Sequence, residues 1–332
     1  MSEKVSILIP AYNAEKWIRE TIMSALSQTW SNCEIIVVDD GSSDKTFDVA
    51  SRFQSKTLKV VRQVNMGASA ARNKALTLAQ GDYIQWLDAD DLLAPDKISQ
   101  QLKNADDRKN PLRLLSSSFG YFYYRMHKAK FLPTKLWQNL TPVEWLITRL
   151  SDRVWIHPAA WLVSRKLTDK IGPWDERLSL NDDGEYFARV VAACDEVKFV
   201  PEAKSYYRQV NTNSLSNTFT HKSRESLYLS LELCYRQLLA LENSERTRTA
   251  ALKHLQICLI NFYPEEQELL KKISELAEEL GGNLTLPKLQ FKYIIIKKLF
   301  GWDVAKNLVF DVPRFKKKAL GHYDRFLNIW AQ

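Results

Sequence analysis

The first part of the chain repeats one pattern, in which a short β-branched run is followed by a polar turn and a helical periodicity. Val5–Ile9 and Glu34–Val38 are such runs, and Leu58–Val61 and Tyr83–Leu87 supply two more strands. Apolar runs of this kind are typical of parallel strands that are buried on both faces. The alternation therefore predicts an α/β fold with a mostly parallel, nucleotide-binding sheet that is flanked by helices.

Beyond this repeat, the sequence predicts further strands and then a change of architecture. Arg113–Tyr124, Val154–Val163 and Lys198–Tyr207 are expected to be later strands of the same sheet. The rest of the chain is dominated by amphipathic helical segments and ends in a basic, aromatic tail. We therefore predict an α/β domain over residues 1–217 and a mainly helical C-terminal extension over residues 218–332.

Composition limits the class of protein without identifying its partners. The 332 residues, of which 45% are hydrophobic, are enough to bury one large core. The apolar runs are shorter than the ~20 residues of a membrane-spanning helix and the start lacks a signal-peptide layout, so a cytoplasmic protein is expected. The net charge of +8 is concentrated late in the chain. The cysteine spacing argues against a disulfide framework or a zinc site and favours reduced, buried thiols at Cys33, Cys194, Cys234 and Cys258.

Carboxylates crowd the end of the predicted strand Tyr83–Leu87, where Asp88, Asp90 and Asp91 follow directly. Such crowding is unfavourable without a cation, and Mg²⁺ or Mn²⁺ binds carboxylates together with substrate phosphates. Ligands of open α/β sheets also bind beyond the carboxyl ends of the strands. Alternatively, Asp90 or Asp91 caps the helix predicted from Leu92 onward. The motif alone does not separate a metal site from a helix cap.

A second acidic strand end lies at Asp39 and Asp40, ahead of Gly41 and two serines. A carboxylate here can accept a hydrogen bond from the N–H of a uracil-like base or from a ribose hydroxyl. Ordinary turn and capping chemistry explains the same residues equally well.

The order and spacing of these segments resemble the family 2 glycosyltransferases of the GT-A fold, and the resemblance covers roughly residues 3–215. The segments that carry it are Ile9–Asn13, Val38–Ser42, Asn65–Asn73 and Leu87–Asp91. The resemblance implies an inverting enzyme that moves a sugar, a hexose, from a UDP-, GDP- or dTDP-sugar to an acceptor hydroxyl. The implied acceptor is a glycan or a lipid-linked or cell-surface saccharide, and no nucleic acid is involved.

The resemblance also implies roles for the residues of the donor side. Tyr12 would stack on the base, Asp39 would bind it, Asp88 would reach the ribose, and Asp90 would hold Mn²⁺ or Mg²⁺. Arg72 would lie near the nucleotide or its phosphates, although it can also be a structural ion-pair partner. The other donor-site residues implied are Pro10, Ala11, Asn13, Asn65, Gly67 and Ala89.

An acidic pair, Asp182-Asp183, follows a Gly-Pro-Trp-Asp-Glu segment, as the family pattern requires. By this match Asp183 is the general base that deprotonates the acceptor hydroxyl. Asp182, Trp174 and His157 would lie on the acceptor side. The pair can instead cap the following helix, and a lone His beside a strand is often structural.

One position departs from the family pattern. Many relatives carry a His where this chain has Val210, so any role of that His in metal or diphosphate binding is absent or moved. A non-catalytic, nucleotide-sugar-binding component of a glycan-assembly complex is the alternative function, but the presence of Asp90 and Asp183 favours an enzyme.

The C-terminal tail mixes basic and aromatic residues from Lys288 to Lys318. One interpretation is peripheral contact with the inner face of an anionic membrane, where a lipid-linked acceptor would be found. The other is that the apolar residues pack on the preceding domain and the lysines face solvent.

Overall fold

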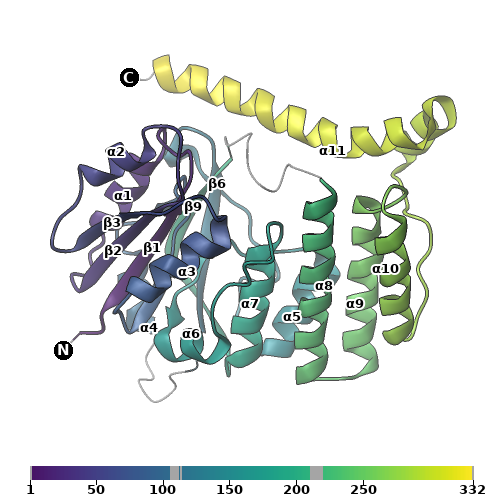
Figure 1. The fold of residues 1–332 in the computed structure, drawn as a ribbon, viewed down its shortest axis with the longest axis horizontal. Coiled ribbons are helices and arrows are strands. Elements are labelled where there is room, and N and C mark those ends of the chain that lie inside the picture. The colour runs from purple at the N-terminus through teal and green to yellow at the C-terminus, as the bar shows by residue number, and fades with distance from the viewer. Residues whose placement is uncertain (1, 105–111, 113, 210–219, 331–332) are drawn as a thin grey trace.

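The computed structural model describes residues 2–104, 112, 114–209 and 220–330. Its first sheet has the strand order β3-β2-β1-β4-β8, in which β1 to β4 are parallel and β8 is antiparallel. The strands are β1 (Val5–Ala11), β2 (Cys33–Asp39), β3 (Leu58–Arg62), β4 (Tyr83–Trp86) and β8 (Val163–Ser164). The predicted parallel, helix-flanked sheet is thereby confirmed (Figure 1).

A second sheet has the order β5-β9-β6-β7, with β6 and β9 running parallel. Its strands are β5 (Leu92–Leu93), β6 (Leu114–Phe122), β7 (Lys130–Phe131) and β9 (Val197–Arg208). The strands expected at 113–124 and 198–207 therefore exist, but the prediction that they extend the first sheet was wrong. The segment 154–163 is largely irregular, because Pro158 opens a 3₁₀ turn and only Val163 and Ser164 pair with β4.

Helices surround both sheets and make up the C-terminal part of the chain. Those of the first part are α1 (Ile18–Leu26), α2 (Thr46–Ser51), α3 (Ala68–Leu78), α4 (Lys97–Asn104), α5 (Pro142–Asp152), α6 (Arg165–Ile171) and α7 (Asp182–Ala193). Those that follow are α8 (His221–Leu241), α9 (Glu245–Cys258), α10 (Gln267–Glu279) and α11 (Phe291–Trp330). Short 3₁₀ turns lie at Met126–Lys128, Pro158–Ala160 and Leu259–Asn261.

Alternate residues of the first sheet belong to two separate cores, one on each face. Ile7 and Ile9 of β1 belong to the core that includes α1, whereas Leu8 belongs to the core that includes Ala71 and Ala75 of α3. Burial on both faces explains why these strands read as continuous apolar runs in the sequence.

The core on the α3 face continues into the C-terminal helices. Leu238 of α8, Leu255 of α9 and Ile273 of α10 belong to the same contiguous cluster as Leu8 and Trp86 of the sheet. Figure 1 shows these helices standing beside α7 and α5. The extension is thus packed onto the α/β part, while the boundary predicted at residue 217 lies outside the described residues.

Helix α11 crosses the molecule from its helical end to the α/β part (Figure 1). It is kinked at Gly301, whose φ is 86°. At one end Lys306 donates a hydrogen bond to the carbonyl oxygen of Tyr263 at 2.6 Å, and near the other Asp324 pairs with Arg125 at 2.8 Å. Among the described residues, no helix is long and apolar enough to cross a membrane.

Candidate active site

A cavity of about 540 Å³ opens where β1 and β4 end and where α3 and α7 begin. Ligands bind at this edge of open α/β sheets because the strand ends and helix starts converge there. The structure brings most of the predicted residues together in the cavity wall: Pro10, Ala11, Tyr12, Asn65, Gly67, Arg72, Asp88, Ala89, Asp90, Asp182 and Asp183. Asn13, Asp39, Trp174 and His157 are not among the lining residues.

Asn13 orders the turn behind the cavity and does not line the donor site as predicted. Its backbone N–H donates to the hydroxyl of Ser42 at 2.9 Å, and its side-chain oxygen accepts from the N–H of Ser43 at 2.9 Å. The residue has a φ of 48°, a conformation that asparagine tolerates better than most residues. Asn13 therefore connects the end of β1 to the turn after β2.

Asp39 is fully buried at the end of β2, where it is paired in register with Ala11 of the cavity wall. Its Oδ2 atom accepts from the N–H of Ser42 at 3.3 Å and pairs with Arg62 at 3.2 Å. Among the residues that the structure describes, none donates a hydrogen bond to its Oδ1 atom. A buried, unsatisfied carboxylate oxygen is costly, so this atom is suited to a donor on a bound ligand.

Sequence reasoning did not single out Asp40, which lines the cavity beside Asn65. Its carboxylate accepts from the backbone N–H groups of Met66 and Gly67 at 3.0 and 2.8 Å. Asp40 therefore shapes the start of α3. The sequence signal for it was its place directly after Asp39, at the end of a predicted strand and ahead of Gly41.

The three acids that follow β4 have separate environments. Asp88 pairs with Arg72 at 3.0 Å. Asp91 is fully buried and accepts from the backbone N–H of Arg208 at 2.8 Å and from Nδ1 of His157 at 3.3 Å. Since α4 begins only at Lys97, the alternative that Asp91 or Asp90 caps a helix starting at Leu92 was wrong.

Asp90 is the acid of this loop that is left for a ligand, because no other described side chain donates a hydrogen bond to its carboxylate. Burial, followed by the charges of Asp91 and Asp88, raises the pKa of Asp90 to about 8. A cation at the carboxylate would relieve both effects.

The fit to a divalent metal is partial. Among the described residues, no group of three or more His, Cys, Asp or Glu side chains is arranged to hold a metal ion. Mg²⁺ and Mn²⁺ are often held by one or two carboxylates and complete their coordination with substrate phosphates and water. Asp90 fits that second arrangement and not a metal site built from protein ligands alone.

His157 does not reach the acceptor side, contrary to the prediction. It is fully buried, shares a hydrogen bond with the hydroxyl of Ser205 at 2.8 Å and packs on Phe119 with ring centroids 4.8 Å apart. Burial lowers the pKa of His157 to about 3. It is a neutral structural residue beneath Asp91.

Trp174 is also a structural residue and does not lie on the acceptor side as predicted. Its ring is buried and stacks on Tyr186 with centroids 3.9 Å apart and planes 3° apart. The guanidinium of Arg72 lies over the ring, 4.4 Å from its centroid. The Gly-Pro-Trp-Asp-Glu segment therefore supports the cavity from behind.

Arg72 joins the two acidic segments of the cavity. Its guanidinium pairs with Asp182 at 2.6 Å and with Asp88 at 3.0 Å. Burial alone would lower the pKa of Arg72, but the charges of Asp182 and Asp88 outweigh burial and raise it. The structural ion-pair role that the sequence left open is thus present, in a residue that also lines the cavity.

Asp183 lies in the first turn of α7, and helix α8 fixes the loop that precedes it. The hydroxyl of Ser226 accepts from the N–H groups of Ser179 and Leu180 at 2.8 and 2.9 Å. The side chain of Asn181 donates to the hydroxyl of Ser230 at 2.9 Å. The C-terminal extension thus determines where the acidic pair stands.

The acidic pair has the electrostatics of a proton acceptor. Burial, followed by the charge of Asp182, raises the pKa of Asp183, while Arg72 and Arg149 oppose the rise. The carboxylate accepts a hydrogen bond from its neighbour, the N–H of Gly184, at 2.7 Å. A raised carboxylate pKa, nearer to neutrality, is what a general base requires.

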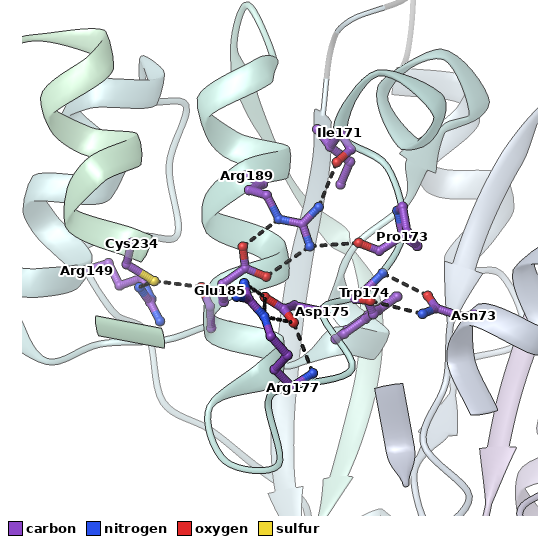
Figure 2. A network of polar contacts seen from close by, with 11 residues as sticks. Asn73, Arg149, Ile171, Pro173, Trp174, Asp175, Arg177, Glu185, Arg189 and Cys234 are labelled. Atoms are coloured by element: carbon purple, nitrogen blue, oxygen red, sulfur yellow. Dashed lines mark hydrogen bonds and ion pairs between the residues drawn. The ribbon is translucent and has the colours of Figure 1, made fainter. Parts of the chain in front are cut away.

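A polar network holds α7 against the preceding segment (Figure 2). Arg189 pairs with Glu185 on the same helix and donates to the carbonyl oxygens of Ile171 and Pro173 at 2.7 and 2.9 Å. The side chain of Asn73 on α3 accepts a hydrogen bond from the backbone N–H of Trp174 at 2.8 Å and donates one to its carbonyl oxygen at 2.9 Å. Helix α3, which carries Arg72, and helix α7, which carries Asp183, therefore both form hydrogen bonds with the segment that precedes α7.

A smaller cavity of about 120 Å³ continues from Asp183. Trp155, Asn181 and Asp183 line both cavities, and Arg149 and Trp145 line the smaller one. Asp183 thus stands between the large cavity and a second, aromatic-lined recess.

Further lining residues were missed by sequence reasoning, among them Trp17, Arg208 and Lys317. Arg208 pairs with Glu20 at 2.6 Å and donates to the carbonyl oxygen of Asp90 at 2.7 Å. Its place in the segment with the departure at Val210 was a signal for it, although Val210 itself lies outside the described residues. Lys317 comes from α11 and has no local signal.

The chain is similar to glycosyltransferases of known sequence and structure. Residues 6–171 match the family described as glycosyl transferase family 2. An uncharacterised glycosyltransferase of Rickettsia typhi is 31% identical over 69% of this chain and 72% of its own length. The Escherichia coli enzyme named UDP-Glc:alpha-D-GlcNAc-diphosphoundecaprenol beta-1,3-glucosyltransferase WfaP is 44% identical, but over 32% of this chain and 43% of its own length.

Solved structures agree with this fold. The crystal structure of residues 1–349 of S. aureus TarS in complex with UDP-GlcNAc matches with a TM-score of 0.68 and 20% identity, over 83% of this chain and 81% of TarS 1–349. At this identity the likeness shows the fold alone. The match to the family model and the similarity to the rickettsial protein show more: the chain belongs to glycosyl transferase family 2 and is a glycosyltransferase.

Proposed function

We propose that this chain is an inverting hexosyltransferase that moves a sugar from UDP to a hydroxyl of a lipid-linked saccharide, with Asp183 as the general base. The observation that carries the proposal is that Asp183, a buried carboxylate with a raised pKa, lines the same cavity as Asp90, the acid suited to a metal–diphosphate complex. A base and a leaving-group site in one cavity are the requirements of a single displacement.

The proposed donor rests on Asp39 and Tyr12. The unsatisfied Oδ1 atom of Asp39 is complementary to the N–H of uracil. Tyr12 lines the cavity with a ring that is 54% exposed, so that it can stack on a base. Guanine and thymine also carry an N–H. UDP is favoured because the names of WfaP and of the TarS complex both contain a UDP-sugar.

The proposed reaction forms one bond and breaks one bond at the anomeric carbon of the donor sugar. The acceptor hydroxyl loses its proton to Asp183 as its oxygen forms a bond to the anomeric carbon. The bond from that carbon to the diphosphate breaks, and its electron pair stays on the phosphate oxygen, so the anomeric configuration inverts. A divalent cation held by Asp90 and the diphosphate would supply charge neutralisation at the leaving group.

The proposed acceptor side is the recess that Asp183 shares with Trp155. Aromatic rings pack well on the apolar faces of sugars, and Trp155 is 36% exposed. A sugar bound in this recess would present its hydroxyl at Asp183, where the recess meets the larger cavity that holds the donor.

The membrane part of the proposal rests on the outward side of α11. Phe315 and Trp330 are 75% and 76% exposed, and the spacing of Phe315, Tyr323 and Phe326 places them on one side of the helix. Lys316 and Lys318 flank that side, and nearby basic residues each add about 1 kcal/mol at an anionic surface. The protein would thus bind peripherally where lipid-linked acceptors are found.

Replacing the proposed base tests the mechanism. Asp183→Asn keeps the shape of the side chain but removes its proton affinity, so kcat should fall by roughly 10²–10⁴. UDP affinity, measured by calorimetry, should change little. Asp169→Asn, an exposed acid on α6, is the matched control and should leave both unchanged. Weaker UDP binding with normal kcat would place Asp183 in the donor site instead.

Replacing the proposed metal ligand tests the donor side. Wild-type protein should bind UDP more tightly with Mn²⁺ than with a chelator, because Asp90 and the diphosphate share the ion. Asp90→Ala should bind UDP equally in both conditions, whereas Asp48→Ala, an exposed acid on α2, should keep the difference. A metal-dependent gain that survives in Asp90→Ala would show that another group holds the ion.

Liposome co-sedimentation tests the membrane contact. The wild-type chain should bind anionic vesicles at low salt and be released at high salt, because screening weakens surface attraction. Phe315→Ser together with Phe326→Ser should reduce binding, since both outward rings are lost, whereas Met23→Ser, an exposed apolar residue on α1, should not. Equal binding by all three proteins would contradict a membrane role for α11.

A further inference from the structure

The cavity wall includes one residue that comes from the far end of the chain. Lys317 of α11 lines the cavity together with Asp90. It lies on the inward side of the helix, because it is one or two turns away from the buried Gly321 and from Asp324, which contacts the α/β part. The outward rings of α11 are on the opposite side.

Two anchors hold Lys317 over the cavity. Asp324 accepts from the backbone N–H groups of Tyr124 and Arg125 at 2.9 and 3.1 Å, in addition to its ion pair with the Arg125 side chain. On the other side, Lys306 is buried against the carbonyl oxygen of Tyr263. The segment between these anchors spans about 27 Å as a helix, and Lys317 lies within it.

Lys317 differs from the two arginines of the cavity wall in its ion pairing. The guanidinium of Arg72 is already paired with two carboxylates, and that of Arg208 with Glu20. Lys317, by contrast, makes no ion pair or hydrogen bond with any residue in the described part of the chain. Lys317 and Asp90 line the same cavity. Partial burial lowers the pKa of Lys317, and the charge of Asp90 opposes this.

A diphosphate entering this cavity would meet several carboxylates and would need cations that are not already paired. We propose that Lys317 is a donor-site residue that binds the diphosphate of the nucleotide sugar, so that α11 completes the donor site. This inference rests on the proposed nucleoside-diphosphate donor. As the bond between the anomeric carbon and the diphosphate breaks, Lys317 would stabilise the electron pair that stays on the phosphate oxygen.

The test compares UDP with uridine, which lacks the phosphates. Lys317→Ala in the full chain should weaken UDP binding by about tenfold, the usual scale for losing one charge-assisted hydrogen bond. Uridine binding should not change. Calorimetry in a chelator measures both affinities without added metal, and a matching thermal unfolding midpoint shows that the variant is folded.

Neighbouring lysines provide matched controls. Lys316→Ala and Lys318→Ala remove the same charge from the same helix at positions that do not line the cavity. Because the measurement contains no lipid, their proposed membrane contact does not contribute, and both variants should bind UDP as the wild type does. Lys317→Arg should retain most of the affinity because it keeps the cation.

Three results with the variants would overturn this inference and leave the proposed donor in place. One is unchanged UDP affinity in Lys317→Ala; another is an equal loss for uridine and UDP, which would indicate a displaced helix. The third is an equal loss in all three alanine variants, which would indicate a general field of charge. Wild-type protein that binds no UDP, GDP or dTDP would overturn the proposed donor along with this inference.

Discussion

The arrangement of the site depends on one buried guanidinium between two acidic segments. Arg72 pairs with Asp88, which follows β4, and with Asp182, which begins α7. Without Arg72, the carboxylates of Asp88 and Asp182 would face one cavity and lose the partner that they share. A buried charge that loses its partner is strongly destabilising. These two ion pairs fix the spacing between the segment after β4 and the acidic pair. The stacking of the guanidinium on the ring of Trp174 fixes the orientation of Arg72.

The C-terminal helices contribute to the cavity as well as to the core. Ser226 and Ser230 of α8 hold the loop before Asp183 in place by accepting its N–H groups. Helix α11 then crosses the same cavity and contributes Lys317 to its wall. The loop before Asp183, the proposed base, is thus held by a helix outside the region that matches the family model.

The sequence predicted features that depend on a short stretch of residues, and it missed features that depend on contacts between distant parts of the chain. The parallel strands and the acids at their ends, Asp90 among them, follow from hydrophobic runs that stop at carboxylates, whereas Asp183 was predicted from the resemblance to a family pattern. The pairing of β6 with β9 and the burial of His157 depend on contacts far apart in the chain, which periodicity does not encode. Lys317 was missed for the same reason: the helical pattern of the tail gives no register relative to the cavity.

The proposed reaction is a single displacement in which Asp183 deprotonates the acceptor on the side away from the leaving diphosphate. NMR of the product, after transfer from a UDP-sugar with an α-anomeric bond, reads its anomeric configuration from the one-bond carbon–proton coupling and the three-bond proton–proton coupling at the anomeric position. The account predicts a β-linked product. An α-linked product would contradict it, because retention requires a different use of the carboxylates in this cavity.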